Sequence, residues 1–154
     1  MKILILSDTH GEISAAERII RRENPNHVIH LGDCLRDAEE LSHLFPVLPI
    51  CKIPGNNDWF SDEAKEKVIF LGETKIFLCH GHTTGVKSGL DVQWAKAKKA
   101  DCNVSLFGHT HRPFLEERDG VLLLNPGSVT YGGTYALLTL SPKEPPKAEI
   151  KYDD

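Results

Sequence analysis

Five short polar motifs in this chain follow apolar runs of strand length, and this repeated placement strongly constrains the fold. The motifs are Asp8-Thr9-His10, Gly32-Asp33, Gly55-Asn56-Asn57-Asp58, His80-Gly81-His82 and Gly108-His109-Thr110-His111. In open α/β sheets the loops beyond the carboxyl ends of the strands gather at one edge, so residues that are distant in sequence converge there. We therefore expect the five motifs to form a single site.

The apolar runs rich in Val, Ile and Leu predict strands that are buried on both faces. These runs are Ile3 to Leu6, Val28 to Leu31, Val47 to Ile53, Lys67 to Leu71, Lys75 to Cys79, Val104 to Phe107, Val121 to Leu124 and Thr134 to Leu140. Helices are predicted for Ser14 to Glu23 and for Leu90 to Ala100. This order of elements favours an α/β chain built as a layered sandwich of sheets and helices.

Length and composition indicate one ordinary domain, residues 1–154, with a single active site. The formal net charge is -4 and Lys and Arg do not cluster, which disfavours extended binding along a nucleic-acid backbone. The first apolar run is too short for a signal peptide or a membrane span, so we expect no membrane association and a cytoplasmic location. The scattered cysteines are expected to be reduced thiols that pack as small hydrophobic side chains, namely Cys34, Cys51, Cys79 and Cys102.

The residue types in the motifs suit divalent metal ions. Imidazole nitrogen, carboxylate and amide oxygen are ligands for manganese, iron, zinc or nickel. A carboxylate between two ions can bridge them, and Asp33 is our candidate for that position. With Asp8 and Asp33 as the only anionic ligands, two divalent ions would leave a net positive site that attracts phosphate. Glycines border these ligands and are expected to let the backbone turn close to the metals, namely Gly11, Gly32, Gly55, Gly81 and Gly108.

In order along the chain, the five motifs resemble the signature motifs of the calcineurin-like metallophosphoesterases, and the match spans most of the sequence. The short length and the later segment Asn125-Pro126-Gly127-Ser128 make the chain most similar to the small phosphodiesterase branch. That branch also contains a scaffold subunit of the retromer coat. The resemblance implies a four-layer αββα sandwich, in which two mixed β-sheets are flanked by helices.

The resemblance also implies a ligand set for two divalent metal ions. One ion would be held by Asp8, His10, Asp33 and His111, and the other by Asp33, Asn56, His80 and His109. Manganese is the usual metal of such enzymes, whereas the ligand types also permit iron, zinc or nickel.

The implied activity is hydrolysis of a phosphate ester, with a phosphodiester favoured, by a hydroxide that bridges the two metals. The expected partner is then a small phosphodiester substrate, and homo-oligomerisation stays open. The alternative is a non-catalytic scaffold or protein-binding module on the same fold. The presence of metal-binding residues at all seven implied ligand positions favours the enzyme.

Two positions depart from the family pattern. Asn57 replaces the His that in many members protonates the leaving group, and an amide has no proton to donate at neutral pH. His82 could replace that acid, or it could serve only as a hydrogen-bonding group near His80. The catalytic residues that we predict beside the bridging Asp33 are therefore Asn57, Asp58 and His82. Secondly, Val129-Thr130-Tyr131 stands where this branch often has Pro-Arg, which puts that substrate contact in doubt.

Some residues outside the motifs are given no function. His27, His30 and His43 stay unassigned, and Glu63 and Lys67 have the spacing of a surface ion pair. Trp59 and Phe60 follow the third motif. They could form an apolar wall for a substrate, but we expect them to be buried in the core.

Overall fold

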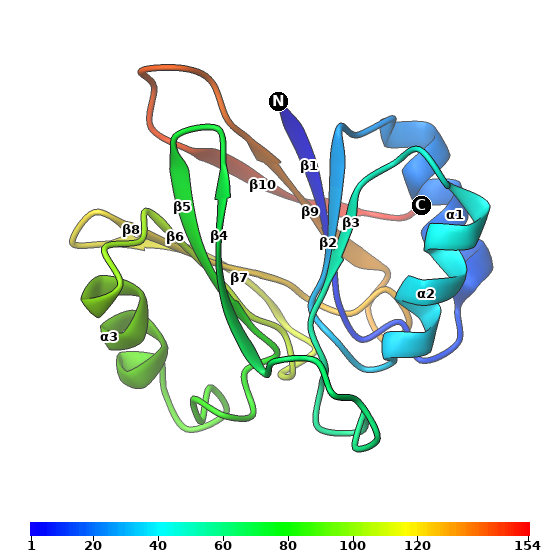
Figure 1. The fold of residues 1–154 in the computed structure, drawn as a ribbon, viewed down its shortest axis with the longest axis horizontal. Helices are drawn as coiled ribbons and strands as arrows, with labels where there is room; N and C mark the ends of the chain where they lie inside the picture. Colours follow the sequence, from blue (N-terminus) through cyan, green and yellow to red (C-terminus); the bar gives the residue numbers. More distant parts are fainter.

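Two five-stranded sheets pack face to face and are covered by helices on their outer sides (Figure 1). The computed structural model describes every residue from Met1 to Asp154. Helices α1 (Ile13–Glu23) and α2 (Leu35–Leu44) lie on one side, and α3 (Asp91–Lys99) lies on the other. The predicted αββα sandwich is confirmed.

The first sheet has the order β10-β9-β1-β2-β3. Strands β1, β2 and β3 run parallel to one another, β9 pairs antiparallel with β1, and β10 pairs antiparallel with β9 at the edge. The bounds are β1 Lys2–Leu6, β2 His27–His30, β3 Ile50–Lys52, β9 Thr134–Thr139 and β10 Lys147–Tyr152. The three parallel strands therefore end at the same edge of the sheet.

The second sheet has the order β4-β5-β6-β8-β7. Strands β5, β6 and β8 are parallel, whereas the two edge strands β4 and β7 are antiparallel to their neighbours. The bounds are β4 Glu66–Leu71, β5 Thr74–Cys79, β6 Val104–Leu106, β7 Pro113–Arg118 and β8 Val121–Pro126. Both sheets are thus mixed, with a parallel centre.

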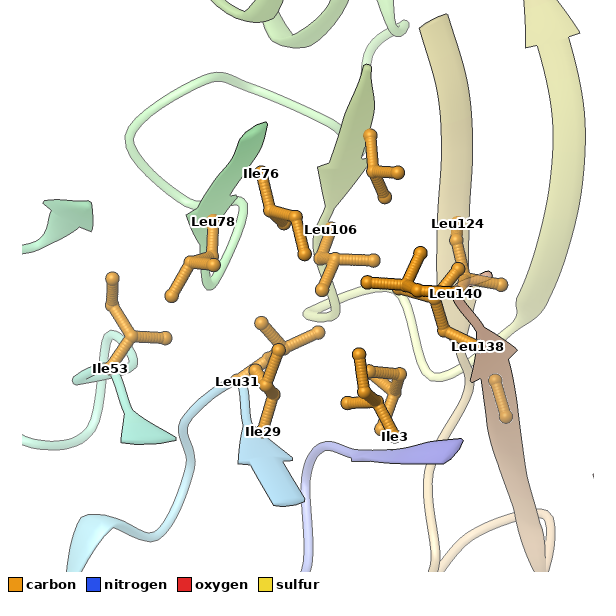
Figure 2. Close-up of a cluster of buried hydrophobic side chains, with 13 residues drawn as sticks. Ile3, Ile29, Leu31, Ile53, Ile76, Leu78, Leu106, Leu124, Leu138 and Leu140 are labelled. Atoms are coloured by element: carbon orange, nitrogen blue, oxygen red, sulfur yellow. The ribbon is translucent and has the colours of Figure 1, made fainter. Parts of the chain in front are cut away.

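The central core lies between the two sheets and consists of aliphatic side chains (Figure 2). Ile3, Ile29 and Leu138 project from the first sheet toward Ile76 and Leu106 of the second. A second buried cluster joins the outer face of the first sheet to α1 and α2, and a third joins the second sheet to α3. Because the central strands are apolar on both faces, their runs of Val, Ile and Leu could be recognised in the sequence.

Three elements were not predicted, and each has a weak pattern. Helix α2 begins at Leu35 without a side-chain cap, and most of its residues are polar. Strands β7 and β10 lie at the edges of the sheets and carry mostly polar or half-buried residues. The predicted strand from Val47 to Ile53 is shorter than expected, because Pro49 lacks the N–H that a sheet ladder needs.

Two smaller expectations, for the cysteines and for one ion pair, have clear outcomes. All four cysteines are free thiols, and two of them, Cys79 and Cys102, are buried. The ion pair between Glu63 Oε2 and Lys67 Nζ is present at 2.7 Å. None of the helices combines the length and the apolar character needed to cross a membrane.

Truncation of a side chain in the central core should destabilise the fold far more than truncation at the surface. Leu138 is 0% exposed, whereas Val47 is 95% exposed. Leu138→Ala removes buried methyl groups and leaves a cavity, so we expect a loss of about 2–5 kcal/mol in the free energy of unfolding. Urea unfolding monitored by circular dichroism measures this loss. Val47→Ala is the control, and an equal loss in both variants would contradict this placement of the core.

Candidate metal centre

The five polar motifs lie at the carboxyl ends of parallel strands, as predicted from their spacing. Asp8 follows β1, Asp33 follows β2 and Asn56 follows β3, all in the first sheet. His80 follows β5, and His109 follows β6 in the second sheet. Since the two sheets pack face to face, ligands from both meet at the lower edge of the sandwich in Figure 1.

Asp8, His10 and His111 form the first cluster of groups that could hold a metal ion, with nitrogen and carboxylate oxygen atoms that lie within 4.8 Å of one another. The Oδ1 atom of Asp8 lies 3.2 Å from Nε2 of His111 and 3.8 Å from Nε2 of His10. Nε2 of His10 is buried and has no hydrogen-bond partner. His111 therefore hydrogen-bonds to Asp8, whereas the nitrogen of His10 points into the cluster without a partner.

Asp8, Asp33 and His80 form the second cluster, and all three are buried. Nδ1 of His80 lies 2.7 Å from the carbonyl oxygen of Leu31. A carbonyl can only accept, so Nδ1 carries the proton and Nε2 of the neutral ring has a free lone pair. That atom lies 3.8 Å from Oδ1 of Asp8 and 3.6 Å from Oδ2 of Asp33, and it has no hydrogen-bond partner.

Three further predicted site residues surround these clusters. The ring of His109 lies 5.0 Å from that of His80, and the ring of His82 lies 5.6 Å from that of His80. Burial lowers the pKa of His109 to about 4 and also lowers the pKa of His82, so both imidazoles are neutral at pH 7. Asn56 is exposed and shares a small cavity of about 260 Å³ with His82.

Asn57 and Asp58 support the Asp33 loop. The backbone N–H of Asn57 donates to Oδ1 of Asp33 at 3.0 Å, and its side-chain Nδ2 donates to Oδ2 at 2.9 Å. The carboxylate of Asp58 accepts three backbone N–H groups, from Asp33, Leu35 and Gly55, at 2.8–3.1 Å. Asp58 therefore joins the second motif to the third, and Asn57 orients the Asp33 carboxylate.

The backbone at this edge is held in a conformation that residues with side chains rarely adopt. Positive φ angles occur at five of the seven predicted ligands, Asp8, His10, Asp33, His109 and His111. A residue other than Gly in this region costs free energy and persists only where its surroundings impose it, most often at functional sites. The clustering of these residues at a single edge supports a functional assignment of that edge.

At two of the predicted motif glycines, no larger residue would fit. A Cβ atom at Gly55 would lie 2.0 Å from Oδ1 of Asp33, and a Cβ atom at Gly108 would lie 2.9 Å from Oδ2 of Asp8. The two buried carboxylates thus occupy room that only glycine leaves free.

The sequence analysis missed several supporting residues. Ser7 donates a hydrogen bond of 2.5 Å to Oδ2 of Asp8, and nothing in its sequence position distinguishes it from a strand residue. The side chain of Asn125 donates to the carbonyl oxygen of Gly108 at 3.0 Å, and Ser128 donates to the carbonyl oxygen of Asp8 at 2.8 Å. The Asn-Pro-Gly-Ser segment therefore holds the first and fifth motifs together.

Tyr131 is a further neighbour of the first cluster. Its ring stacks on His111 with centroids 4.8 Å apart and an angle of 12° between the planes. The same ring contacts the edge of His10, with centroids 5.2 Å apart. Tyr131 lies in the segment that departs from the family pattern, and there it covers two imidazoles of the site.

His30 is buried beneath the first motif and belongs to a closed network of hydrogen bonds. The N–H of Gly32 donates to its Nδ1 at 3.2 Å, so Nε2 carries the ring proton and donates to Oγ1 of Thr9 at 2.9 Å. Thr9 in turn donates to Oδ2 of Asp37 at 2.5 Å. The neutral imidazole thus links the first two motifs to α2, a role that its sequence position did not reveal.

We expect His30 to make stability depend on pH. Burial lowers its pKa to about 4 from an ordinary value of 6.5. The unfolded chain therefore takes up this proton first, so the stability that neutral His30 contributes is complete above pH 6.5 and is lost as the pH falls toward 4. Between pH 7 and pH 5 the metal-free wild type should lose on the order of 2 kcal/mol more than His30→Gln.

Urea titrations of both proteins with a chelator present measure this difference. The other histidines are common to the two proteins, so their contributions cancel in the comparison. Stability curves that run parallel from pH 7 to pH 5 would show that His30 is not the group responsible.

Comparison with known proteins agrees with this geometry. The sequence model of the calcineurin-like phosphoesterase superfamily domain matches residues 1–143. A probable metallophosphoesterase of Bacillus subtilis, YsnB, is 33% identical over 100% of this chain and 91% of its own length. A phosphodiesterase of Methanocaldococcus jannaschii is 34% identical over 82% of this chain and 83% of its own length.

Among solved structures, Vps29 from Entamoeba histolytica, crystallised in complex with Zn²⁺, has a TM-score of 0.76 to this chain. The two are 19% identical, and the match covers 100% of each chain, so this likeness concerns the fold alone. The family model and the two sequence relatives establish the family as well as the fold, because they match most of the chain, including the part that carries the five motifs. This chain belongs to the calcineurin-like phosphoesterase superfamily.

Proposed function

We propose that this chain is a phosphodiesterase that depends on two divalent metal ions. The observation that carries the proposal is the pair of unpartnered imidazole nitrogens, Nε2 of His10 and Nε2 of His80, beside two buried carboxylates. Carboxylates buried without a compensating positive charge are costly. A cation between these groups would satisfy the carboxylates and the nitrogen lone pairs together.

The residues present fit such ions. Ligand atoms that share one ion lie roughly 3–4 Å apart when each bond is about 2 Å long, and the separations around Nε2 of His80 are 3.6 and 3.8 Å. We assign Asp8, His10, Asp33 and His111 to one ion, and Asp33, Asn56, His80 and His109 to the other. Manganese is our first choice, and iron, zinc or nickel would suit the same donors.

When bound, the ions would lower the pKa of a coordinated water and withdraw charge from the phosphoryl oxygens. The chain itself supplies orientation. Asn57 holds both oxygens of Asp33, and Asp58 fixes the backbone on either side of that carboxylate. We therefore propose that both act by positioning Asp33. His82 lies beside His80 and is the candidate to protonate the leaving oxygen. Burial lowers the pKa of His82, so only the minor, protonated form could donate at pH 7.

The remaining assignments follow from this proposal. Residues 1–154 would act as one domain with one site, on a small phosphodiester, in the cytoplasm. The alternative is a scaffold on the same fold, which would be free to lose the metal ligands that this chain retains at all seven implied positions. Hydrolysis of bis-p-nitrophenyl phosphate by the purified protein, with and without added Mn²⁺, separates the two. Inactivity with manganese, iron, zinc and nickel in turn would favour the scaffold.

Replacement of Asp33 should remove more metal than replacement of any ligand that serves a single ion. If Asp33 bridges, Asp33→Ala loses a ligand from both ions, and we expect fewer than one ion per chain by elemental analysis and the largest loss of activity. His111→Ala is the comparison and should retain the second ion. Asp8 belongs to both observed clusters. If Asp33→Ala keeps two ions while Asp8→Ala loses both, the bridge is Asp8.

The leaving group should control the rate, because Asn57 cannot donate a proton. Good leaving groups such as nitrophenolate need little protonation, whereas alkoxides need much. We expect a steep decrease of kcat/KM as the pKa of the leaving group rises, measured over a series of aryl and alkyl phosphodiesters. His82→Asn should steepen this dependence if His82 is the acid, and Asn57→His should flatten it if the new imidazole reaches the leaving oxygen.

Metal content must be measured for both variants, since Asn57 also holds Asp33. Unchanged slopes in two fully metallated variants would mean that protonation of the leaving group does not limit the reaction.

A further inference from the structure

Trp59 and Phe60 are exposed side by side, which contradicts the expected burial in the core. Their exposed fractions are 79% and 98%, and their rings stack with centroids 6.3 Å apart and 23° between the planes. The prediction was wrong because the segment after the third motif leaves β3 and forms a loop that projects beyond the edge of the sheets (Figure 1). Large exposed aromatic groups are a free-energy cost in water and often mark a binding surface.

These two rings line a cavity beside the proposed metal centre. The cavity has a volume of about 830 Å³, within the range of small-molecule sites. Asn57 and Asp58 also line it, and both contact the Asp33 loop through hydrogen bonds. A molecule in this cavity would therefore contact Asn57 and Asp58, which separate it from Asp33.

Trp59 also lines the smaller cavity of about 260 Å³ that contains Asn56 and His82. The indole thus stands between the larger cavity and the groups closest to the reacting phosphate. Lys65, which lines the smaller cavity too, has no ion-pair partner. A phosphate held near Asn56 could direct an attached ring toward Trp59.

Among the charged residues of the larger cavity, Arg36 and Asp62 have no ion-pair partner. Glu39 pairs with Lys52 at 3.2 Å, and Glu63 pairs with Lys67 at 2.7 Å. Arg36, from the start of α2, lines the cavity without an ion pair. The larger cavity therefore combines an aromatic wall with an unpaired guanidinium, which suits a planar polar ring, and the attached phosphate would lie in the smaller cavity with Lys65.

We propose that Trp59 and Phe60 bind the planar aromatic group of the substrate, so that the preferred substrates are phosphodiesters that carry a ring of the nucleobase type. The inference rests on the proposed function and adds a substrate class to it. Stacking between a base and an aromatic side chain contributes enough free energy to change affinity on the order of 10- to 100-fold. Trp59 and Phe60 line a cavity that also contains Asn57 and Asp58 of the proposed site. This position favours a substrate ring over the surface of a second protein as the group that they bind.

A binding experiment tests the cavity without hydrolysis. The chain has two tryptophans, so Trp94→Phe leaves Trp59 as the only indole. Titration of this variant with adenosine should quench its fluorescence, titration with ribose should not, and AMP should bind more tightly than ribose 5-phosphate in the Zn²⁺-loaded protein. Equal effects of adenosine and ribose would overturn the proposal.

A kinetic experiment with a constant leaving group tests selectivity. Thymidine 5′-p-nitrophenyl phosphate and methyl p-nitrophenyl phosphate release the same nitrophenolate and differ only in the retained group. We expect the wild type to prefer the thymidine ester, and Trp59→Ala to reduce the ratio of the two kcat/KM values by on the order of 10- to 100-fold. Phe70→Ala is the matched control, because Phe70 is 65% exposed on β4 and lines neither cavity.

The outcomes separate this inference from the proposed function. If no ester is hydrolysed with any metal but adenosine still quenches Trp59, the cavity binds rings while the assigned reaction is wrong. If the esters are hydrolysed but Trp59→Ala keeps the wild-type ratio of kcat/KM values, the proposed reaction is supported and the proposed ring site is wrong. If the wild type sediments as a dimer and Trp59→Ala as a monomer, the aromatic pair contacts a second copy and the substrate assignment is overturned.

Discussion

The buried carboxylate of Asp8 is the group on which the arrangement of this site depends. Its side chain is 0% exposed, and it accepts hydrogen bonds from Ser7 and from the backbone N–H of His109. These contacts connect the end of β1 in the first sheet to the loop after β6 in the second. A buried charge must be compensated, and the imidazoles of His10, His80 and His111 around its Oδ1 atom are placed to share that compensation with a cation. The convergence of five loops is therefore an electrostatic requirement as well as a consequence of topology.

Much of the fold could be predicted because the central strands are apolar on both faces. Runs such as Ile3 to Leu6 indicate a buried strand whatever its neighbours are, and the motifs that follow such runs must lie at a sheet edge. The edge strands β7 and β10 and the helix α2 escaped prediction because their polar residues carry no such signal. The burial of Trp59 was predicted wrongly for a different reason. An aromatic side chain has the same hydrophobic character in a core and in a binding surface, so the sequence does not distinguish the two.

The convergence of the Asp and His side chains was predictable from residue types and spacing, whereas the residues that orient them were not. The hydrogen bonds of Asn57 to Asp33 and of Asp58 to three backbone N–H groups depend on the path of two loops in space. In the sequence, Asn57 was notable because its amide has no proton to donate to a leaving group. In the structure, its side-chain amide and its backbone N–H both donate hydrogen bonds to the carboxylate of Asp33. The same holds for His30, whose function as a neutral link between loops is defined only by its partners Thr9 and Gly32.

Under the proposed function the two sheets contribute different ligands, so the distance between the sheets would set the distance between the two sets of ligands. Asp8 and Asp33 follow strands of the first sheet, His80, His109 and His111 follow strands of the second, and the spacing of the two sets is maintained by the aliphatic layer between them (Figure 2). A close-packed interior transmits small changes of volume to its surroundings. Ionic radius and coordination geometry differ among the metals that these donors accept. If the proposed ions bind, selectivity for one metal over another would depend on the packing of core side chains such as Leu78 and Leu31 as well as on the ligands themselves.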